Sequence, residues 1–120
     1  MDHSFEKKLV LTHKVDIDVL FADGKREKSH PFVVLHMDQS PINEIPFKLL
    51  ISVPKRNFKR AVDRNYLKRC IREIVRTNKG LMPSYVDRTI AIAILYSFKN
   101  KLSFLELKKS LTNALNQIHF

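Results

Sequence analysis

The residues best suited to chemistry in this sequence are cations that recur every four positions. Lys or Arg stands at positions 60, 64, 68, 72 and 76, with no acidic residue in the series. Residues four apart are neighbours on a helix, and each like-charge pair destabilises an isolated helix by roughly 0.2–0.5 kcal/mol. Phosphate groups relieve such repulsion, because they bind Lys and Arg with release of counterions. The series therefore favours a polyanion as the partner of this helix.

On a helical wheel the same segment separates into two arcs. One arc, the basic face, comprises Arg64, Asn65, Lys68, Arg69, Arg72 and Arg76. The opposite arc is apolar and comprises Leu67, Cys70, Ile71 and Ile74. It predicts a buried face, on which the thiol acts as a small hydrophobe. A solvated face would normally mix charges of both signs, and a membrane-binding face would need an exposed apolar stripe, so the pattern favours nucleic acid.

The other polar residues do not form a catalytic or metal-binding pattern. Asp16, Asp18 and Asp23 are the only close acidic group, and spacings of two and seven do not gather them into one tight helical site. The five histidines lack the spacing of metal ligands, and two glycines exclude a glycine-rich phosphate loop. We predict no catalytic residue and no metal ligand in the polypeptide, and we interpret the aspartates as solvated acids.

The charge of the chain is concentrated in one region. The net charge is +10 over 120 residues, and within residues 55–79 ten Lys or Arg stand against only Asp63 and Glu73. Such a local patch is typical of a polyanion-binding surface. The length suits a single domain over residues 1–120. One cysteine, no apolar signal core in residues 1–8 and no membrane-length apolar run predict a cytoplasmic protein.

Three helices are expected to position these residues, over residues 10–22, 59–78 and 103–118. The apolar side of the first helix is expected to comprise Leu9, Val15, Val19 and Leu20. Its end is predicted at Gly24 in the left-handed conformation. Gly80 and Pro83 end the second helix, and Ser103 with Glu106 forms a capping box at the start of the third.

Three β-type segments are expected, over residues 32–37, 47–53 and 89–98, with a short extra strand near residues 25–28. Residues 38–45 contain Pro and Asn and predict a hairpin between the first two segments. The third segment is apolar on both faces, which is typical of an interior strand. A mixed sheet with helices packed against it, an α+β fold, accommodates these elements.

The segment ISVPKRNFKRAVDRNYLKRCIREIVR, residues 51–76, resembles the signature of the bacterial ribonuclease P protein subunit family. That signature is a strand ending in Ser-Val, a lysine-rich turn, and Ala-Val-x-Arg-Asn-x-x-Lys-Arg-x-x-Arg-Glu. Similar stretches are VLFADGKR at residues 19–26, PFVVLHM at 31–37 and LSFLELKKSL at 102–111. The resemblance implies a single-domain αβββαβα sandwich, like the second domain of ribosomal protein S5, with a rare left-handed βαβ crossover.

The resemblance also implies a function, in a complex that cuts the 5′ leader from precursor tRNA. The chemistry would belong to a catalytic RNA and its Mg²⁺, and the partners would be that RNA and the leader, without a membrane or an obligatory protein partner. In the family, the Arg-Asn-Arg region and the preceding turn approach the RNA. The predicted RNA-binding surface therefore includes these residues and the neighbouring cations of the basic patch. The predicted RNA-binding surface comprises Lys55, Arg56, Lys59, Arg60, Arg64, Asn65, Lys68, Arg69, Arg72 and Arg76.

The family's second surface is a cleft between the first helix and the sheet that holds the single-stranded leader. Phe21 matches a cleft aromatic, and its other interpretation is a core phenylalanine. Ile17 and Leu35 stand where the family is often aromatic, so leader stacking is expected to be weaker or to use Phe32 or His36. The predicted leader-binding cleft comprises Ile17, Phe21, Phe32, Val34 and His36.

Two further departures from the family pattern concern the basic helix. Tyr66 stands where the third residue of Arg-Asn-Arg is usually arginine, near the edge of the basic face. The turn over residues 54–60 is one residue longer than usual and lacks its glycine. Two alternatives to the family function remain, a generic RNA-binding or ribosomal-type protein and a stand-alone endonuclease.

Overall fold

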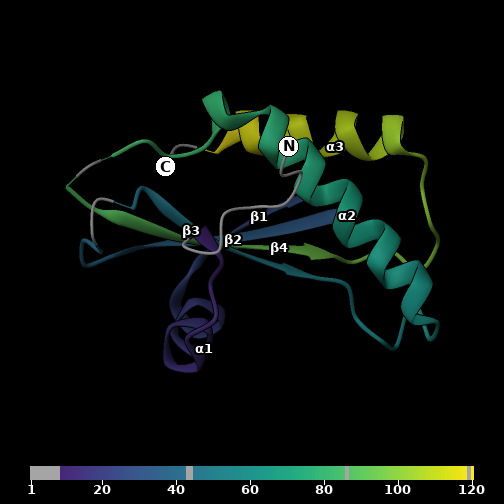
Figure 1. The fold of residues 1–120 in the computed structure, drawn as a ribbon, viewed down its shortest axis with the longest axis horizontal. Helices are drawn as coiled ribbons and strands as arrows, with labels where there is room; N and C mark the ends of the chain where they lie inside the picture. The colour runs from purple at the N-terminus through teal and green to yellow at the C-terminus, as the bar shows by residue number, and fades with distance from the viewer. Residues whose placement is uncertain (1–8, 43–44, 86, 119) are drawn as a thin grey trace.

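Three α-helices and four strands form the part of the chain that the computed structural model describes, residues 9–42, 45–85, 87–118 and 120 (Figure 1). The elements are α1 (Lys14–Asp23), β1 (Lys25–Ser29), β2 (Phe32–Gln39), β3 (Phe47–Ser52), α2 (Ala61–Thr77), the 3-10 helix η2 (Lys79–Leu81), β4 (Thr89–Tyr96) and α3 (Phe104–Gln117). This is the expected αβββαβα order, and β1 confirms the extra strand. The expectation for residues 1–8 lies outside the described residues.

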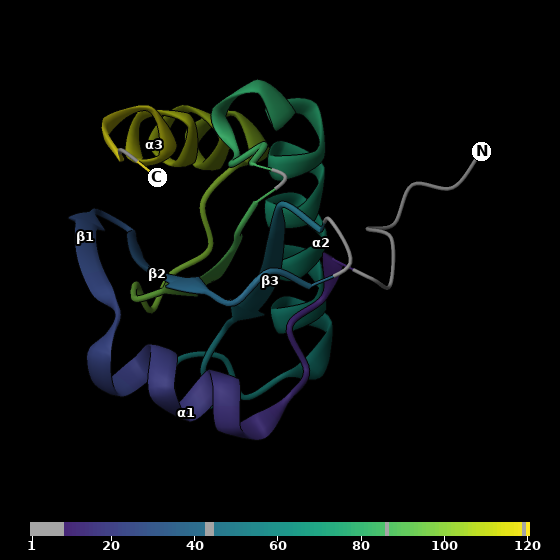
Figure 2. The same cartoon turned by 90° about the vertical axis from the view of Figure 1, so that its left-hand side faces the viewer.

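The strands form one mixed sheet in the order β1-β2-β4-β3, with α2 and α3 on one face and α1 on the other (Figure 2). β4 runs antiparallel to β2 and parallel to β3, and only its Leu95 is not fully buried. The predicted interior position of this strand is confirmed. The predicted hairpin between residues 32–37 and 47–53 is wrong, because β4, which is apolar on both faces, lies between the two strands and pairs with each.

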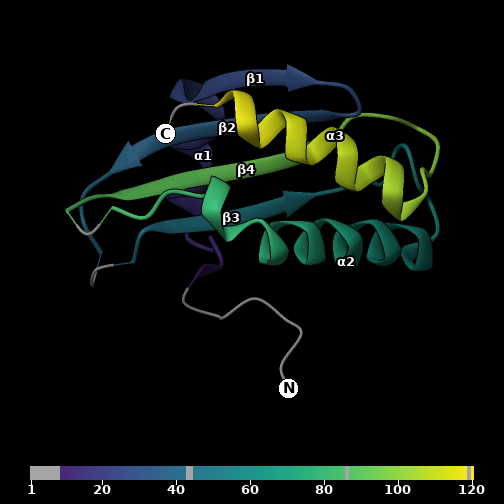
Figure 3. The same ribbon diagram turned by 90° about the horizontal axis from the view of Figure 1, so that it is seen from above.

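The connection from β3 through α2 to β4 joins two parallel neighbours. Seen from the side of α2 with both strands pointing to the right, β4 lies above β3 (Figure 3). The crossover is therefore left-handed, as the family resemblance implied, although about 98% of such connections are right-handed. Its handedness determines on which face of the sheet the basic helix lies.

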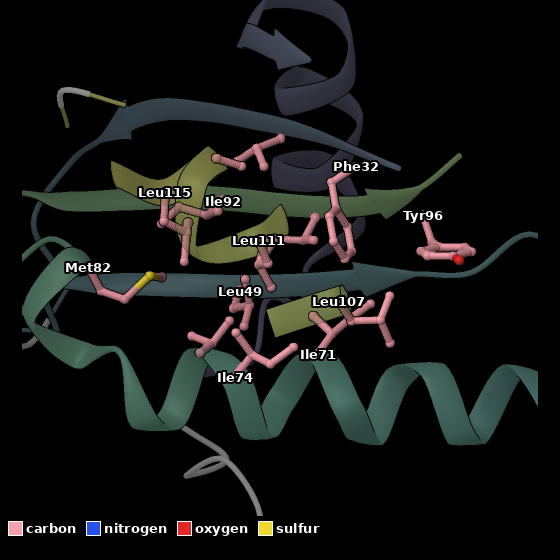
Figure 4. Packing of buried hydrophobic residues seen from close by; sticks show 14 of the residues in the cluster. Phe32, Leu49, Ile71, Ile74, Met82, Ile92, Tyr96, Leu107, Leu111 and Leu115 are labelled. Atoms are coloured by element: carbon pink, nitrogen blue, oxygen red, sulfur yellow. The ribbon is translucent and has the colours of Figure 1, made fainter. Parts of the chain in front are cut away.

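The main core lies between the sheet and the pair α2 and α3. The side chains drawn in Figure 4 come from both helices and from the sheet, among them Ile71, Ile74, Ile92, Leu107 and Leu111. All four residues of the predicted apolar arc of α2, Cys70 included, are buried in this core. That prediction is confirmed. Within the described residues, no helix has the length and apolar composition to cross a membrane.

α1 packs on the other face of the sheet against a smaller cluster, which comprises Leu11, Leu20, Leu35, Ala91 and Ala93. The two alanines of β4 leave room for the helix to lie close to the sheet. Of the apolar side expected for this helix, Leu20 is fully buried, but Val15 and Val19 are 62% and 40% exposed. The helix instead packs against the sheet through Ile17, Leu20 and Phe21.

The start of α1 also differs from the expected one. The helix begins at Lys14 rather than at residue 10. The residues before it run beside the edge strand β3, where the Leu11 amide donates a hydrogen bond of 2.8 Å to the Leu49 carbonyl. Leu9 is therefore buried in the main core instead of on the helix.

Of the helix ends predicted from the sequence, one differs in the structure and one is confirmed. Gly24 has φ −66°, so the predicted left-handed stop is wrong. A Cβ at this position would lie 2.5 Å from the Leu20 carbonyl oxygen, and this close approach is what requires a glycine. At α3 the predicted capping box of Ser103 and Glu106 is present, which satisfies two otherwise unpaired amides.

Candidate nucleic-acid interface

α2 presents the basic face to the outside of the molecule because its apolar arc is held in the main core. Asn65, Arg69 and Arg72 are exposed, and Lys68 is half-buried at the edge of the sheet. A hollow of about 150 Å³ separates this edge from the helix and is lined by Val10, Leu49, Leu50, Ile51, Lys68 and Arg72. The sequence did not predict this hollow, because it depends on residues 9–11 running beside β3.

Arg64 connects the basic face to the turn before it. Its Nη1 atom donates hydrogen bonds to the backbone carbonyls of Phe58 at 2.7 Å and Lys59 at 3.0 Å. The buried ring of Phe58 anchors the same turn in the main core. The exposed cations of the turn, Lys55, Arg56, Lys59 and Arg60, are thereby held beside the start of α2.

Arg76, at the other end of the basic face, is already paired. Its guanidinium donates to both carboxylate oxygens of Glu73 at 2.6–3.1 Å. These hydrogen bonds raise the pKa of Arg76. The ion pair with Glu73 relieves the like-charge repulsion at this end of the helix.

Tyr66 lies away from the basic face, toward the segment that leads into α3. The Nζ atom of Lys101 is 5.5 Å from the centroid of the Tyr66 ring, and the same Nζ is 3.0 Å from a carboxylate oxygen of Asp63. A tyrosine in place of the usual arginine therefore leaves the middle of the basic face intact. Within the described chain no ion pair involves the remaining cations, which are Lys55, Arg56, Lys59, Arg60, Lys68, Arg69 and Arg72.

The predicted cleft residues do not share one face of the sheet. Side chains alternate along a strand, so Leu35 faces α1 while Phe32, Val34 and His36 face the opposite side. Phe32 and Val34 are buried in the main core. His36 lies against Phe120, with ring centroids 5.3 Å apart. The assignment of Phe32, Val34 and His36 to a cleft beside the first helix is therefore wrong.

The surface beside α1 consists of partly buried apolar side chains, called the α1 strip from here on: Ile17, Phe21, Met37, Leu50 and Leu95. The Phe21 ring packs against the cluster under the helix and remains partly exposed, and its role in a leader cleft stays a prediction. The Arg26 guanidinium donates a hydrogen bond of 3.1 Å to the Phe21 carbonyl, which fixes the end of α1.

Cations flank the α1 strip on both edges of the sheet. Residues paired across strands project to the same face, and Arg26 pairs with Leu35 while Lys28 pairs with Val33. At the other edge Lys48 pairs with Ala91. These cations were missed because the register was not predicted. The strip thus combines an aromatic side chain with flanking positive charge, as single-strand-binding surfaces do.

Comparisons with known proteins agree on one family. The family model described as Ribonuclease P matches residues 5–119. The ribonuclease P protein component of Thermotoga maritima is 33% identical over 119 residues, which are 98% of each chain. The chain belongs to the ribonuclease P protein component family. A protein component of this kind acts with the RNase P RNA in a holoenzyme that cleaves RNA and processes tRNA.

Solved structures of ribonuclease P proteins share the fold. The RNase P protein from Thermotoga maritima has a TM-score of 0.71 and 28% identity, over 92% of this chain and 98% of that chain. The RNase P protein of Staphylococcus aureus has a TM-score of 0.68 and 27% identity, over 89% of this chain and 92% of that chain. The mixed α+β fold expected from the sequence is confirmed.

The acidic and histidine side chains of the described residues do not gather in one place. No cluster of three or more His, Cys, Asp or Glu with suitable placement occurs among them. Asp16 instead lies 3.9 Å from the His13 ring nitrogen, as a surface acid of α1.

Arg64 and Lys68 should respond differently to replacement by alanine. Arg64→Ala leaves two turn carbonyls without their donor, so it should lower the free energy of unfolding by about 1–3 kcal/mol and also weaken RNA binding. Lys68→Ala removes no hydrogen bond within the described chain and should weaken RNA binding and its salt dependence with little loss of stability. Urea unfolding and RNA binding at several salt concentrations measure both effects. Equal stability losses would contradict the structural role of Arg64.

Proposed function

We propose that this chain is the protein subunit of ribonuclease P and assists removal of the 5′ leader from precursor tRNA. It binds the catalytic RNA with the basic face of α2 and the adjoining turn, and it holds the leader along the α1 strip. The observation that carries the proposal is the set of cations on α2 and in the turn before it that form no ion pair with another described residue.

The energetics of the free protein support an RNA partner for the basic face. Lys68 and Arg72 are four residues apart and of like charge, so they destabilise the helix by roughly 0.2–0.5 kcal/mol. RNA phosphates relieve this repulsion and release counterions on binding. The planar guanidinium groups of Arg69 and Arg72 can form paired hydrogen bonds with a phosphate.

The α1 strip suits an unpaired RNA segment. A base that stacks on an aromatic ring gains about 1–3 kcal/mol, whatever its sequence. Phe21 is the one aromatic residue of the strip, and Arg26, Lys28 and Lys48 lie where they can contact the backbone phosphates. Ile17 supplies apolar contact without stacking, and Leu35 is fully buried under α1, so the leader contacts one aromatic ring here.

In this proposal the RNA performs the cleavage, and Mg²⁺ belongs to the RNA. Metal ions bound by phosphates can activate a water molecule and stabilise the leaving oxygen. The protein contributes affinity for the leader and positive charge that reduces the need for Mg²⁺ in the folded RNA. We place the holoenzyme in the cytoplasm, without an obligatory second protein.

Reconstitution with a bacterial catalytic RNA at low Mg²⁺ tests the proposal. Cleavage of precursor tRNA should be faster with the protein, and the gain should be larger for a substrate with a leader than for one with a single leader nucleotide. No stimulation would refute the proposed function. Binding of RNA without stimulation would support a generic RNA-binding protein, and cleavage by the protein without RNA would support a nuclease.

A further inference from the structure

The hollow between the edge strand β3 and the basic helix α2 has the size of a single aromatic ring. Its volume is about 150 Å³, and an apolar cavity of about this size holds one benzene-sized ring. Figure 2 shows residues 9–13, in purple, which run from α1 along the edge of the sheet to α2 and form one wall. The lining residues are Val10, Leu49, Leu50, Ile51, Lys68 and Arg72.

The floor of the hollow is apolar and reaches the surface of the protein. Val10 is 37% exposed, and Leu50 and Ile51 are partly exposed. Covering such side chains with another apolar surface is favourable in proportion to the area removed from water. The floor is therefore suited to the flat face of a ring and not to an isolated ion.

Two cations of α2 line the same hollow. Lys68 and Arg72 are four residues apart, so their like charges repel. Neither forms an ion pair with another described residue. A single phosphate group between the two side chains would neutralise both charges and remove the repulsion.

The open edge of β3 adds a backbone donor to the hollow. The Leu49 carbonyl accepts a hydrogen bond from the Leu11 amide, so the backbone groups of Leu49 point away from β4. Backbone groups alternate between the two sides of a strand, and Ile51 therefore directs its N–H and C=O to the same open side. No hydrogen bond of the Ile51 amide to another described residue occurs there, and an unpaired backbone donor favours an acceptor from a ligand.

We propose that the hollow binds one unstacked nucleotide of the catalytic RNA. This inference rests on the proposed function, because it requires the catalytic RNA to lie on the basic face of α2. The base lies on the apolar floor, the Ile51 amide donates to an acceptor on the edge of the base, and the phosphate lies between Lys68 and Arg72.

The combination of an apolar floor with two cations distinguishes a nucleotide from simpler ligands. A free anion would leave the apolar side chains exposed, and an apolar ligand would leave two like charges without a counterion. A nucleotide supplies both a flat ring and a phosphate. The nucleotide must be unpaired, because a base within an RNA helix is stacked between its neighbours and cannot enter the hollow.

Val10→Trp tests the hollow, because the larger side chain fills it and leaves every charge in place. The Kd of this variant for the catalytic RNA should be about tenfold higher, the loss typical of removing one well-packed contact from an interface. Val15→Trp, the same change at a valine of α1 that is 62% exposed, is the matched control and should bind like the wild-type protein. Val10→Leu fills the hollow less and should give a smaller loss, and melting temperatures verify that all three variants fold.

Chemical probing of the 2′-hydroxyl groups of the RNA identifies the nucleotide. One unpaired nucleotide should be protected in the complexes with the wild-type protein and with Val15→Trp, and reactive in the complex with Val10→Trp. Replacing this nucleotide by an abasic ribose should raise the Kd of the wild-type protein about tenfold. The same replacement should leave the Kd of Val10→Trp unchanged, because this variant already excludes the base.

Three results would overturn the nucleotide-binding hollow: wild-type affinity in Val10→Trp, the same protection of the RNA by both proteins, or an equal loss of affinity in both when the base is removed. If the wild-type protein neither binds the catalytic RNA nor stimulates cleavage, the proposed function itself fails, which is a different result.

Discussion

Replacing Lys68, Arg69 and Arg72 together by alanine should raise the Kd for the catalytic RNA by roughly a hundredfold or more. Each side chain is expected to contribute at least about 1 kcal/mol through hydrogen bonds to phosphate, and about 1.4 kcal/mol corresponds to a factor of ten. The slope of log K against log salt should fall by about 2 to 3, since about 0.7–0.9 counterions are released for each phosphate neutralised. Filter binding or fluorescence anisotropy at several salt concentrations measures both quantities.

The stability of the same variant should not fall, and this separates binding from folding. Alanine has the highest helix propensity, and the substitution removes the repulsion between Lys68 and Arg72. The matched control removes the same number of positive charges from exposed positions outside the basic face, at Lys99, Lys108 and Lys109. An equal loss of affinity in the control would mean that net charge, and not the basic face, determines RNA binding.

Much of α2 could be predicted because its signal is local. A helix of period 3.6 with one apolar and one cationic arc has one way to pack against a sheet, and the burial of Leu67, Cys70, Ile71 and Ile74 followed from it. What could not be predicted are the contacts that distinguish one cation from another. Arg64 donates hydrogen bonds to the turn, and Arg76 donates to the Glu73 carboxylate. These contacts depend on the backbone path before the helix and on side-chain rotamers.

The order of the strands in the sheet could not be predicted from the sequence. Strand locations followed from apolar runs, but the order of the strands depends on long-range pairing. β4 begins 50 positions after the end of β2 and separates two strands that are near in sequence. The cleft prediction is wrong because successive side chains of a strand point to opposite faces of the sheet. Leu35 packs on the α1 side of the sheet, and Val34 and His36, its neighbours on each side, necessarily face the other way.

Phe21→Ala should weaken binding of precursor tRNA with a leader by about five- to a hundredfold and change the affinity for mature tRNA little. The estimate corresponds to the loss of about 1–3 kcal/mol of base stacking. The ring is partly exposed beside Leu20 and Leu35, so some stability is lost as well. Both affinities are measured with the reconstituted holoenzyme, and circular dichroism verifies that α1 is retained.

Val15→Ala supplies the control for this variant, because it shortens an apolar side chain of the same helix that is 62% exposed and outside the α1 strip. It should leave both affinities unchanged. Phe21→Leu adds a second comparison, since leucine preserves the apolar packing against α1's own cluster but cannot stack on a base. If Phe21→Leu restores the affinity for the leader, Phe21 acts through the position of α1, and the leader does not stack on its ring. Equal losses for precursor and mature tRNA would place the contact of Phe21 outside the leader altogether.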